Sequence, residues 1–228
     1  MTNVTYTLTK RNAEELLRPE YGVTVISPSG DITNLLQELV KEVPLLEFSP
    51  SLAHTTSGVN QNFNAFSDFE SESIWTRLGK EISESLSKGF QNLGLSDVFK
   101  TPLKLDDLTL QYYPQSKPDE PYALSPHRDQ SGFVNLVAVL LVYGPSTFFI
   151  CKDRNGTTPI EPKEIHSKPG DLVILRAGQL VDESLVRPCH FVGRVEDPKG
   201  RLTFALRQIT DDKSKVKKLE CFFGKDFK

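Results

Sequence analysis

The hydrophobic period of this sequence changes near residue 100, and that change constrains the fold more than any other feature. In residues 1–100 apolar side chains recur every three or four positions, whereas in residues 107–210 they alternate between turns that contain Pro or Gly. The first repeat places side chains on one face of a helix, and the second places them on one face of a strand. The sequence therefore predicts a mainly β protein with flanking helices.

The helical part contains two clear amphipathic stripes. Residues 31–43 carry one, which Pro44 ends, and residues 70–93 carry a longer one, which Gly94 follows as a C-terminal cap. The intervening residues 49–68 are rich in Ser, Thr, Asn and Phe and are predicted to form a loop. We expect the helices to pack on the outside of the β core.

The β part contains short runs of strand-forming residues with turn signals between them. They are residues 108–113, 122–127, 134–143, 147–152, 171–176, 189–195 and 201–208. Many short strands of similar length favour a jelly roll or barrel over a parallel sheet. At this length we expect residues 1–228 to form one domain, in which mostly helical residues 1–100 support the β core of residues 107–210.

Charge and composition exclude several classes of protein. The chain holds 27 Lys and Arg against 30 Asp and Glu, a formal net charge of −3. This acidic balance argues against a protein that holds nucleic acid by bulk charge, although it leaves a local basic groove open. With 38% hydrophobic and 25% charged residues, the composition is that of an ordinary globular protein and excludes disorder and a coiled coil.

The sequence also bears on location. Its cysteines, Cys151, Cys189 and Cys221, are widely spaced and form no Cys-x-x-Cys pair, which favours reduced thiols. Residues 1–6 lack the basic and apolar stretches of a secretory signal. The longest apolar run, residues 134–143, is too short to span a bilayer. We therefore expect a cytoplasmic protein with no membrane partner.

A candidate metal site begins with His127 and Asp129. Two residues apart in extended backbone, their side chains point to the same face and can ligate one ion. A third ligand can come from His190, which lies in a strand-like segment, whereas His54 and His166 lie in loop-like contexts and are interpreted as surface residues. Two histidines and a carboxylate form the facial triad typical of non-haem Fe(II) oxygenases, and they also suit zinc. A His-x-Asp triplet alone is common by chance, so structural histidines are the alternative.

The strand predicted at residues 201–208 has two contrasting faces. Arg201, Thr203 and Arg207 share one face, and apolar side chains share the other. The polar face can be a solvent-exposed edge. Inside a barrel it would be an anion site instead, because an Arg grips a carboxylate through two parallel hydrogen bonds and a hydroxyl adds a third.

These motifs together resemble the Fe(II)/2-oxoglutarate-dependent dioxygenases, which share a jelly-roll barrel called the double-stranded β-helix. The resemblance rests on His127-x-Asp129, then His190, then Arg201-x-Thr203. It covers residues 107–210. Segments that agree with it include Tyr113-Pro114 and Gly170-Asp171-Leu172-Val173, and Arg207-Gln208 makes the last strand similar to that of the AlkB-type demethylases.

The resemblance implies roles for individual residues. His127, Asp129 and His190 would ligate Fe(II), and 2-oxoglutarate would chelate the metal as cosubstrate. The distal carboxylate of 2-oxoglutarate would pair with Arg201, helped by Thr203 and Tyr113. Arg207 could contact the metal-side carboxylate of 2-oxoglutarate, Asp129 or the substrate, and these three alternatives stay open. Arg207 is also the alternative to Arg201 as the residue that binds the distal carboxylate. Candidates for the substrate pocket, from the two strands nearest the metal, are Gln111, Tyr122 and Ser125.

The implied activity is oxidation by O₂. We expect hydroxylation of a small molecule or an amino-acid side chain, with release of succinate and CO₂. One alternative is an AlkB-like demethylase of nucleic acid, which the arginine pair favours and the net negative charge disfavours. The other is a barrel that senses a metal or ligand without turnover, although such a module would not need open metal positions.

Overall fold

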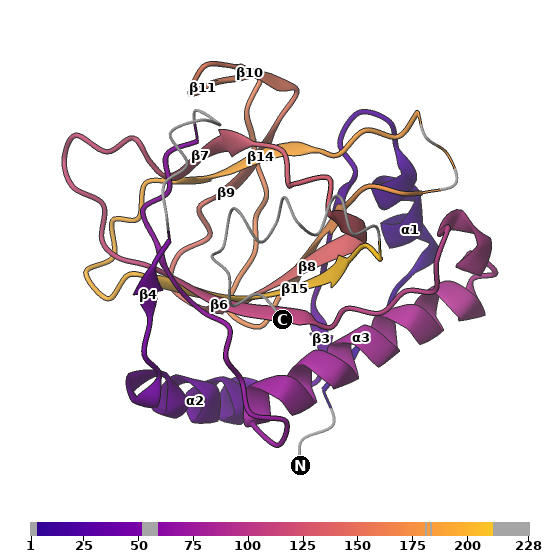
Figure 1. The fold of residues 1–228 in the computed structure, drawn as a ribbon, viewed down its shortest axis with the longest axis horizontal. Helices are drawn as coiled ribbons and strands as arrows, with labels where there is room; N and C mark the ends of the chain where they lie inside the picture. The colour runs from indigo at the N-terminus through magenta and orange to yellow at the C-terminus, as the bar shows by residue number, and fades with distance from the viewer. Residues whose placement is uncertain (1–3, 52–58, 181, 183, 212–228) are drawn as a thin grey trace.

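The structure is a computed structural model that describes residues 4–51, 59–180, 182 and 184–211. The predictions for His54 and Cys221 lie outside the described residues. Two β-sheets face each other, and helices lie along the outer side of the larger sheet (Figure 1). The helical elements are α1 (Lys10–Leu17), α2 (Thr33–Glu42), the short 3-10 turn η1 (Val43–Leu45), α3 (Ile74–Asn92) and the 3-10 turn η2 (Ser96–Val98).

The larger sheet is antiparallel throughout. In spatial order its strands are β2 (Val23–Ile26), β13 (Leu172–Arg176), β8 (Phe133–Tyr143), β15 (Arg201–Ile209), β6 (Asp107–Tyr113), β5 (Asn64–Phe66) and β4 (Ser49–Pro50). This order, with neighbours far apart in sequence, is that of a jelly roll.

The smaller sheet and two short strand pairs complete the β structure. The smaller sheet contains, in spatial order, β12 (Lys163–Glu164), β9 (Phe148–Cys151), β14 (Cys189–Gly193) and β7 (Tyr122–His127). The pairs are β1 (Thr5–Tyr6) with β3 (Pro28–Ser29), and β10 (Asp153–Asn155) with β11 (Thr158–Ile160). The predicted mainly β jelly roll with flanking helices is confirmed, and the ends of the seven predicted strands differ by at most two residues from those observed.

Two hydrophobic cores lie on opposite sides of the larger sheet. The outer core joins that sheet to the helices, with α3 contributing Trp75, Leu78, Ile82, Leu86 and Phe90. The inner core fills the space between the sheets and includes Val137, Val173, Phe148, Ile150 and Val192. Each large apolar side chain buried in this way contributes roughly 1.5–3 kcal/mol relative to exposure.

Strand β15 separates the two cores. Its apolar side chains belong to the outer core, and they are Leu202, Phe204 and Leu206. Arg201, Thr203 and Arg207 alternate with them and are buried as well. Their face is therefore the inner face of the larger sheet, and the alternative of a solvent-exposed polar edge is excluded for this strand.

The predicted helices form with slightly later starts. Helix α3 begins after Ser73, whose Oγ accepts a hydrogen bond from the Thr76 backbone N–H at 3.0 Å. It ends as predicted at Gly94, which has a φ of 69° and donates its N–H to Gln91 O at 2.9 Å. Helix α2 passes into η1 at Pro44, because proline has no N–H to continue the helical hydrogen bonds.

Several elements of the first 100 residues were not predicted. Helix α1 has eight residues, of which only Ala13 and Leu16 are buried, so its stripe is too short to recognise. Strand β2 has four residues and pairs with β13, where Val25 lies opposite Val173. Strands β4 and β5 lie within the region predicted as a loop. Residues 1–100 therefore extend the larger sheet in addition to supplying helices.

Asn135 forms a buried bulge in β8. It has a φ of 59°, and its Nδ2 donates to Gln208 Oε1 at 2.7 Å and to Thr101 O at 3.1 Å. The pairing of β8 with β15 shifts at the same level, between Arg207 and Gln208. The residue that interrupts the longest apolar run thus links β8 to two neighbouring segments.

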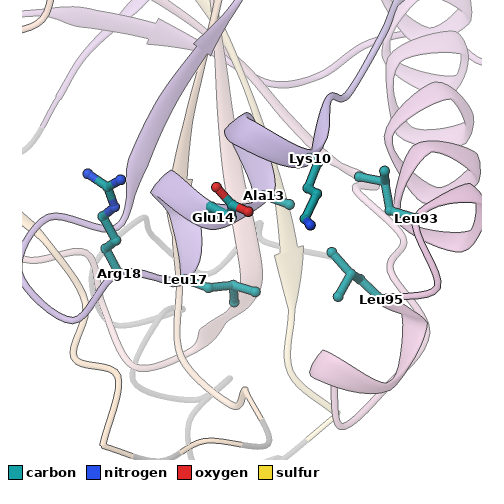
Figure 2. Close-up of a pocket in the computed structure, with 7 residues that line it drawn as sticks. All are labelled: Lys10, Ala13, Glu14, Leu17, Arg18, Leu93 and Leu95. Carbon is teal, nitrogen blue, oxygen red and sulfur yellow. The ribbon is translucent and has the colours of Figure 1, made fainter.

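A surface groove of about 500 Å³ lies where α1 approaches the C-terminal end of α3 (Figure 2). Leu17, Leu93 and Leu95 line it together with charged side chains such as Lys10 and Glu14. None of the predicted site residues lines this groove. Among the described residues, no helix has the length and apolar character needed to cross a membrane.

Candidate metal centre

The three predicted metal ligands converge. His127 at the end of β7 lies directly opposite His190 in β14, and their ring centroids are 4.3 Å apart. Asp129 Oδ1 lies 4.0 Å from His127 Nε2 and 3.8 Å from His190 Nε2. The three potential ligand atoms all lie within 4.8 Å of one another. Pairing of two strands far apart in sequence therefore assembles the triad.

Main-chain hydrogen bonds orient both imidazoles. His127 Nδ1 lies 2.9 Å from Ser125 O, and His190 Nδ1 lies 3.2 Å from Pro188 O. Because a carbonyl oxygen can only accept, we assign the proton of each ring to Nδ1. Each Nε2 then presents a lone pair toward Asp129, which is the arrangement that metal-ligating histidines require.

Burial keeps His127 neutral. Loss of solvation, with a smaller contribution from the neighbouring His190, lowers the pKa of its imidazole to about 4, whereas Asp129 opposes the shift. Phe148 stacks on the His190 ring with centroids 5.5 Å apart, so the apolar inner core reaches the site. At neutral pH the site thus offers neutral imidazole, the form that binds metal ions.

Ser125 has a structural role in this arrangement. Its side chain is fully buried and accepts a hydrogen bond from the Asn60 N–H at 2.9 Å, while its own N–H donates to Asn60 O at 3.0 Å. The pairing of β7 with β14 is irregular on either side of it. Ser125 is predicted as a substrate residue, and its observed contacts orient His127 through the Ser125 main-chain oxygen and link β7 to Asn60.

Arg201 is a buried cation that forms no ion pair among the described residues. Its side chain is 2% exposed, and its Nε has no hydrogen-bond partner. Tyr113 lies opposite it on β6, with the Arg201 Cζ 5.2 Å from the ring centroid. Burial raises the pKa of the Tyr113 hydroxyl to about 12, against the pull of Arg201, so the hydroxyl stays protonated. A buried guanidinium and a protonated hydroxyl therefore lie side by side, which is an arrangement that suits an anion.

Two further predicted residues lie beside this pair. Gln111 Oε1 accepts a hydrogen bond from the Tyr113 hydroxyl at 3.1 Å and lies 3.4 Å from Thr203 Oγ1. Thr203 is directly opposite Gln111 in the sheet and is fully buried. Arg201, Tyr113, Gln111 and Thr203 thus form one polar cluster on the inner face of the larger sheet.

Arg207 has a different environment from Arg201. Its Nε forms an ion pair with Asp107 Oδ2 at 2.6 Å, and its Nη2 donates to Thr109 Oγ1. Its guanidinium also lies over the Phe133 ring, with the Cζ 4.7 Å from the centroid. Burial raises the pKa of Asp107, and the charge of Arg207 opposes that rise. The charge of Arg207 is therefore matched within the protein.

Tyr122 belongs to a separate cluster. It contacts Phe191 edge to face at 5.3 Å and packs in a small core with Cys151, Cys189 and Phe149. The two buried thiols are directly opposite each other, with Sγ atoms 3.1 Å apart. Tyr122 was predicted as a substrate residue, but its contacts are with this cluster.

Sequence reasoning missed two other arginines, one that contacts the triad and one that holds the segment before His190. Arg187 Nη1 donates to the main-chain oxygen of Asp129. Arg176 is 1% exposed and donates to four carbonyl oxygens, two of which are Leu16 O at 2.9 Å and Val186 O at 2.6 Å. Two signals were available in the sequence. Arg176 is a charged residue at the end of an apolar strand, and Arg187 lies three positions before His190.

Solved structures with the same fold are found at low sequence identity. A prolyl-4-hydroxylase from Pseudomonas putida has a TM-score of 0.56 at 13% identity, over 88% of this chain and 98% of that one. HygX from Streptomyces hygroscopicus, with nickel, 2-oxoglutarate and hygromycin B bound, has 0.56 at 13%, over 90% and 88%. The non-heme alpha-ketoglutarate-dependent carbocyclase SnoK from nogalamycin biosynthesis has 0.60 at 12%, over 90% and 85%.

These likenesses establish the fold. The barrel that the sequence resemblance implied is also the barrel of HygX, which was solved with 2-oxoglutarate bound, and the match extends over most of both chains. No protein-family model matches the sequence, and no curated protein matches it either. The activity therefore has to be inferred from the residues of the site.

Proposed function

We propose that this protein is an Fe(II)- and 2-oxoglutarate-dependent oxygenase. Its reaction would convert a substrate C–H group, 2-oxoglutarate and O₂ into a C–OH group, succinate and CO₂. The observation that carries the proposal is the convergence of His127, Asp129 and His190 in a barrel whose inner face also holds Arg201, a buried arginine with no ion pair among the described residues. The substrate would be a small molecule or an amino-acid side chain.

The side chains fit Fe(II) on chemical grounds. Two imidazoles whose Nε2 atoms face Asp129, together with its carboxylate, are the facial donor set of non-haem Fe(II) enzymes. Bound iron would supply activation of O₂, since this donor set leaves positions open for the cosubstrate and O₂. The contribution of the chain is to fix the ligands through Ser125 O and Pro188 O, and to keep water away with apolar neighbours such as Phe148.

Arg201 would bind the distal carboxylate of 2-oxoglutarate. A fully buried guanidinium without an acidic partner is costly, and a carboxylate that accepts two N–H groups removes that cost. Thr203 and the protonated Tyr113 hydroxyl would add hydrogen bonds, each worth about 1.5–3 kcal/mol when the partner is charged. The ion pair with Asp107 makes Arg207 the weaker candidate for this contact, and we expect it to shape the pocket beside the metal.

Two further observations support proposals for the substrate class and the compartment. HygX was solved with hygromycin B bound, so this fold admits small molecules, and that is the class we propose here. Cys151 and Cys189 are free thiols, which agrees with the reducing cytoplasm that we propose as the compartment.

The test is succinate release from 2-oxoglutarate by the purified chain, with Fe(II) and O₂, across a panel of small molecules and peptides. We expect turnover that Fe(II) omission or His190→Ala abolishes while the far-ultraviolet circular dichroism stays unchanged. Arg201→Met should raise the 2-oxoglutarate concentration needed for half-maximal rate at least tenfold. Full activity of His190→Ala would exclude its role as a ligand.

Three results would redirect the assignment. An unchanged 2-oxoglutarate requirement in Arg201→Met would move the distal carboxylate to Arg207. Ligand binding without succinate release would favour the sensing barrel. Turnover with methylated oligonucleotides, bound more weakly as salt rises, would favour the demethylase.

A further inference from the structure

Arg187 connects the candidate metal centre to a second feature of the surface. Its side chain is half-buried, and its Nη1 donates to the main-chain oxygen of Asp129. This is the only hydrogen bond of its guanidinium among the described residues, and the negative charge of Asp129 acts on it without forming a close ion pair. Four of the five N–H donors of this fork are thus left for another partner.

A groove of about 550 Å³ opens on the same residue. Its described lining carries positive charges from Lys100, Arg128 and Arg187 and one negative charge from Asp182. Asp153 pairs with Arg128 at 3.0 Å from outside the groove. The volume suits a small organic molecule, and the balance of charge favours one that bears a single negative group.

The main chain around Arg187 is held firmly. Val186 O accepts hydrogen bonds from Arg176 Nη2 at 2.6 Å and from Arg176 Nε at 3.0 Å. Arg187 O accepts one from Arg128 Nε at 3.1 Å. The guanidinium therefore projects from a fixed point, and a ligand that it binds avoids the cost of ordering the segment.

We propose that Arg187 binds the carboxylate of a small organic acid, and that this acid is the substrate. The proposal rests on the oxygenase function and names its substrate class. The planar fork of an arginine matches a carboxylate through two parallel hydrogen bonds. A phosphate would need more hydrogen-bond donors than the Arg187 guanidinium provides, and the Asp182 carboxylate, which also lines the groove, supplies none. Because Arg187 also contacts Asp129, an acid bound there lies beside the triad.

The experiment compares N-acetyl amino acids with the corresponding N-acetyl amino-acid amides, which differ only in the charge of one group. Binding is measured by calorimetry on protein loaded with Zn(II) and 2-oxoglutarate, and succinate release is measured separately with Fe(II). We expect at least one acid to bind tenfold or more tightly than its amide. Arg187→Gln should remove this preference by weakening the acid alone, because the glutamine keeps a donor for Asp129 O but not the charge.

Two variants serve as comparisons. Lys100→Gln removes one positive charge from the groove at a residue that is not a metal ligand, and it should weaken acid binding by a smaller factor than Arg187→Gln. Arg194→Gln removes an exposed arginine that is bound to Pro118 O, outside the groove lining, and should change neither binding nor turnover. Zinc content is measured in every variant, so that loss of the metal is not mistaken for loss of the acid.

The outcomes separate this proposal from the oxygenase function. Equal affinity for acids and amides in the unaltered protein, or no binding of any acid at millimolar concentration, would overturn it without any variant. Succinate release stimulated equally by acids and amides would overturn it and keep the oxygenase. Charge-selective binding that depends on Arg187, with no 2-oxoglutarate turnover at all, would keep the acid site and refute the oxygenase.

Discussion

At the scale of single residues, two arginines on one strand show how environment decides role. Arg201 and Arg207 lie six positions apart on the inner face of β15 and are equally buried. Asp107 neutralises Arg207 at 2.6 Å, whereas Arg201 faces the Tyr113 ring and no carboxylate among the described residues. The sequence pattern presents both as anion binders, and only the cross-strand partner distinguishes them.

We expect Asp107→Asn to destabilise the protein by about 3–5 kcal/mol, because it removes the carboxylate that pairs with the buried charge of Arg207. The double variant Asp107→Asn/Arg207→Met should recover most of that loss. Asp153→Asn is the matched control, since its ion pair with Arg128 is largely exposed and should contribute less than about 1 kcal/mol. Urea unfolding measures each value, and equal effects of the two single variants would contradict the assignment.

Stability of the metal-free protein should depend on pH through His127. Its pKa is about 4 in the fold and 6.5 when solvated, so the unfolded chain binds the proton more tightly. The contribution is complete above pH 6.5 and disappears as the pH falls toward 4, with a limit of about 3 kcal/mol. Urea unfolding between pH 4 and 8 measures this slope. His127→Gln should flatten it, and an equal slope in that variant would assign the effect to other groups.

At the scale of elements, the sequence predicted those whose side-chain pattern is long enough to read. The strand at residues 122–127 and the helix that ends at Gly94 were both recognised, because each shows several repeats or a clear stop signal. Strand β2 has only four residues, and its place in the sheet comes from pairing with β13. Such pairing is tertiary information, which no local pattern contains.

The same limit applies to the site. His127, Asp129 and His190 were recognisable from spacing and chemistry, and their convergence agrees with that reading. The contacts of Tyr122 and Ser125 were not recognisable from the sequence, because an irregularity in β7 and a hydrogen bond from Asn60 decide where those side chains lie. A pattern of alternate residues assumes a regular strand, and irregular strands break that assumption.

Arg176 connects helix α1 to the segment before His190, and its removal should weaken both. Its guanidinium donates to carbonyls of Leu16 and Val186, among others, so Arg176→Met leaves several buried acceptors unpaired. We expect a loss of about 2–4 kcal/mol in urea unfolding and a weaker affinity for Zn(II). Arg194→Met, at an exposed position, should change neither. Unchanged zinc affinity in Arg176→Met would show that the segment holds its position without this anchor.

At the scale of the whole molecule, the metal site joins strands that are far apart in sequence. His127 and His190 face each other across β7 and β14, and Asp129 begins the connection to β8 in the opposite sheet. An ion held by all three would therefore link both sheets at one end of the barrel. The unfolded chain has no such preformed site, so the binding energy adds to the stability of the fold.

We expect Zn(II) at one hundred times its dissociation constant to stabilise the folded protein by about 2.7 kcal/mol. For a domain of this size, that corresponds to a rise in melting temperature of roughly 5–10 °C. The rise should shrink as the pH falls toward 4, because burial holds the pKa of His127 near 4 in the metal-free fold and a protonated imidazole cannot bind the ion. Differential scanning fluorimetry with and without EDTA measures it. His190→Ala should abolish the rise and His166→Ala should keep it, since His166 is exposed and lies outside the triad. An equal rise in both variants would mean that the ion binds elsewhere.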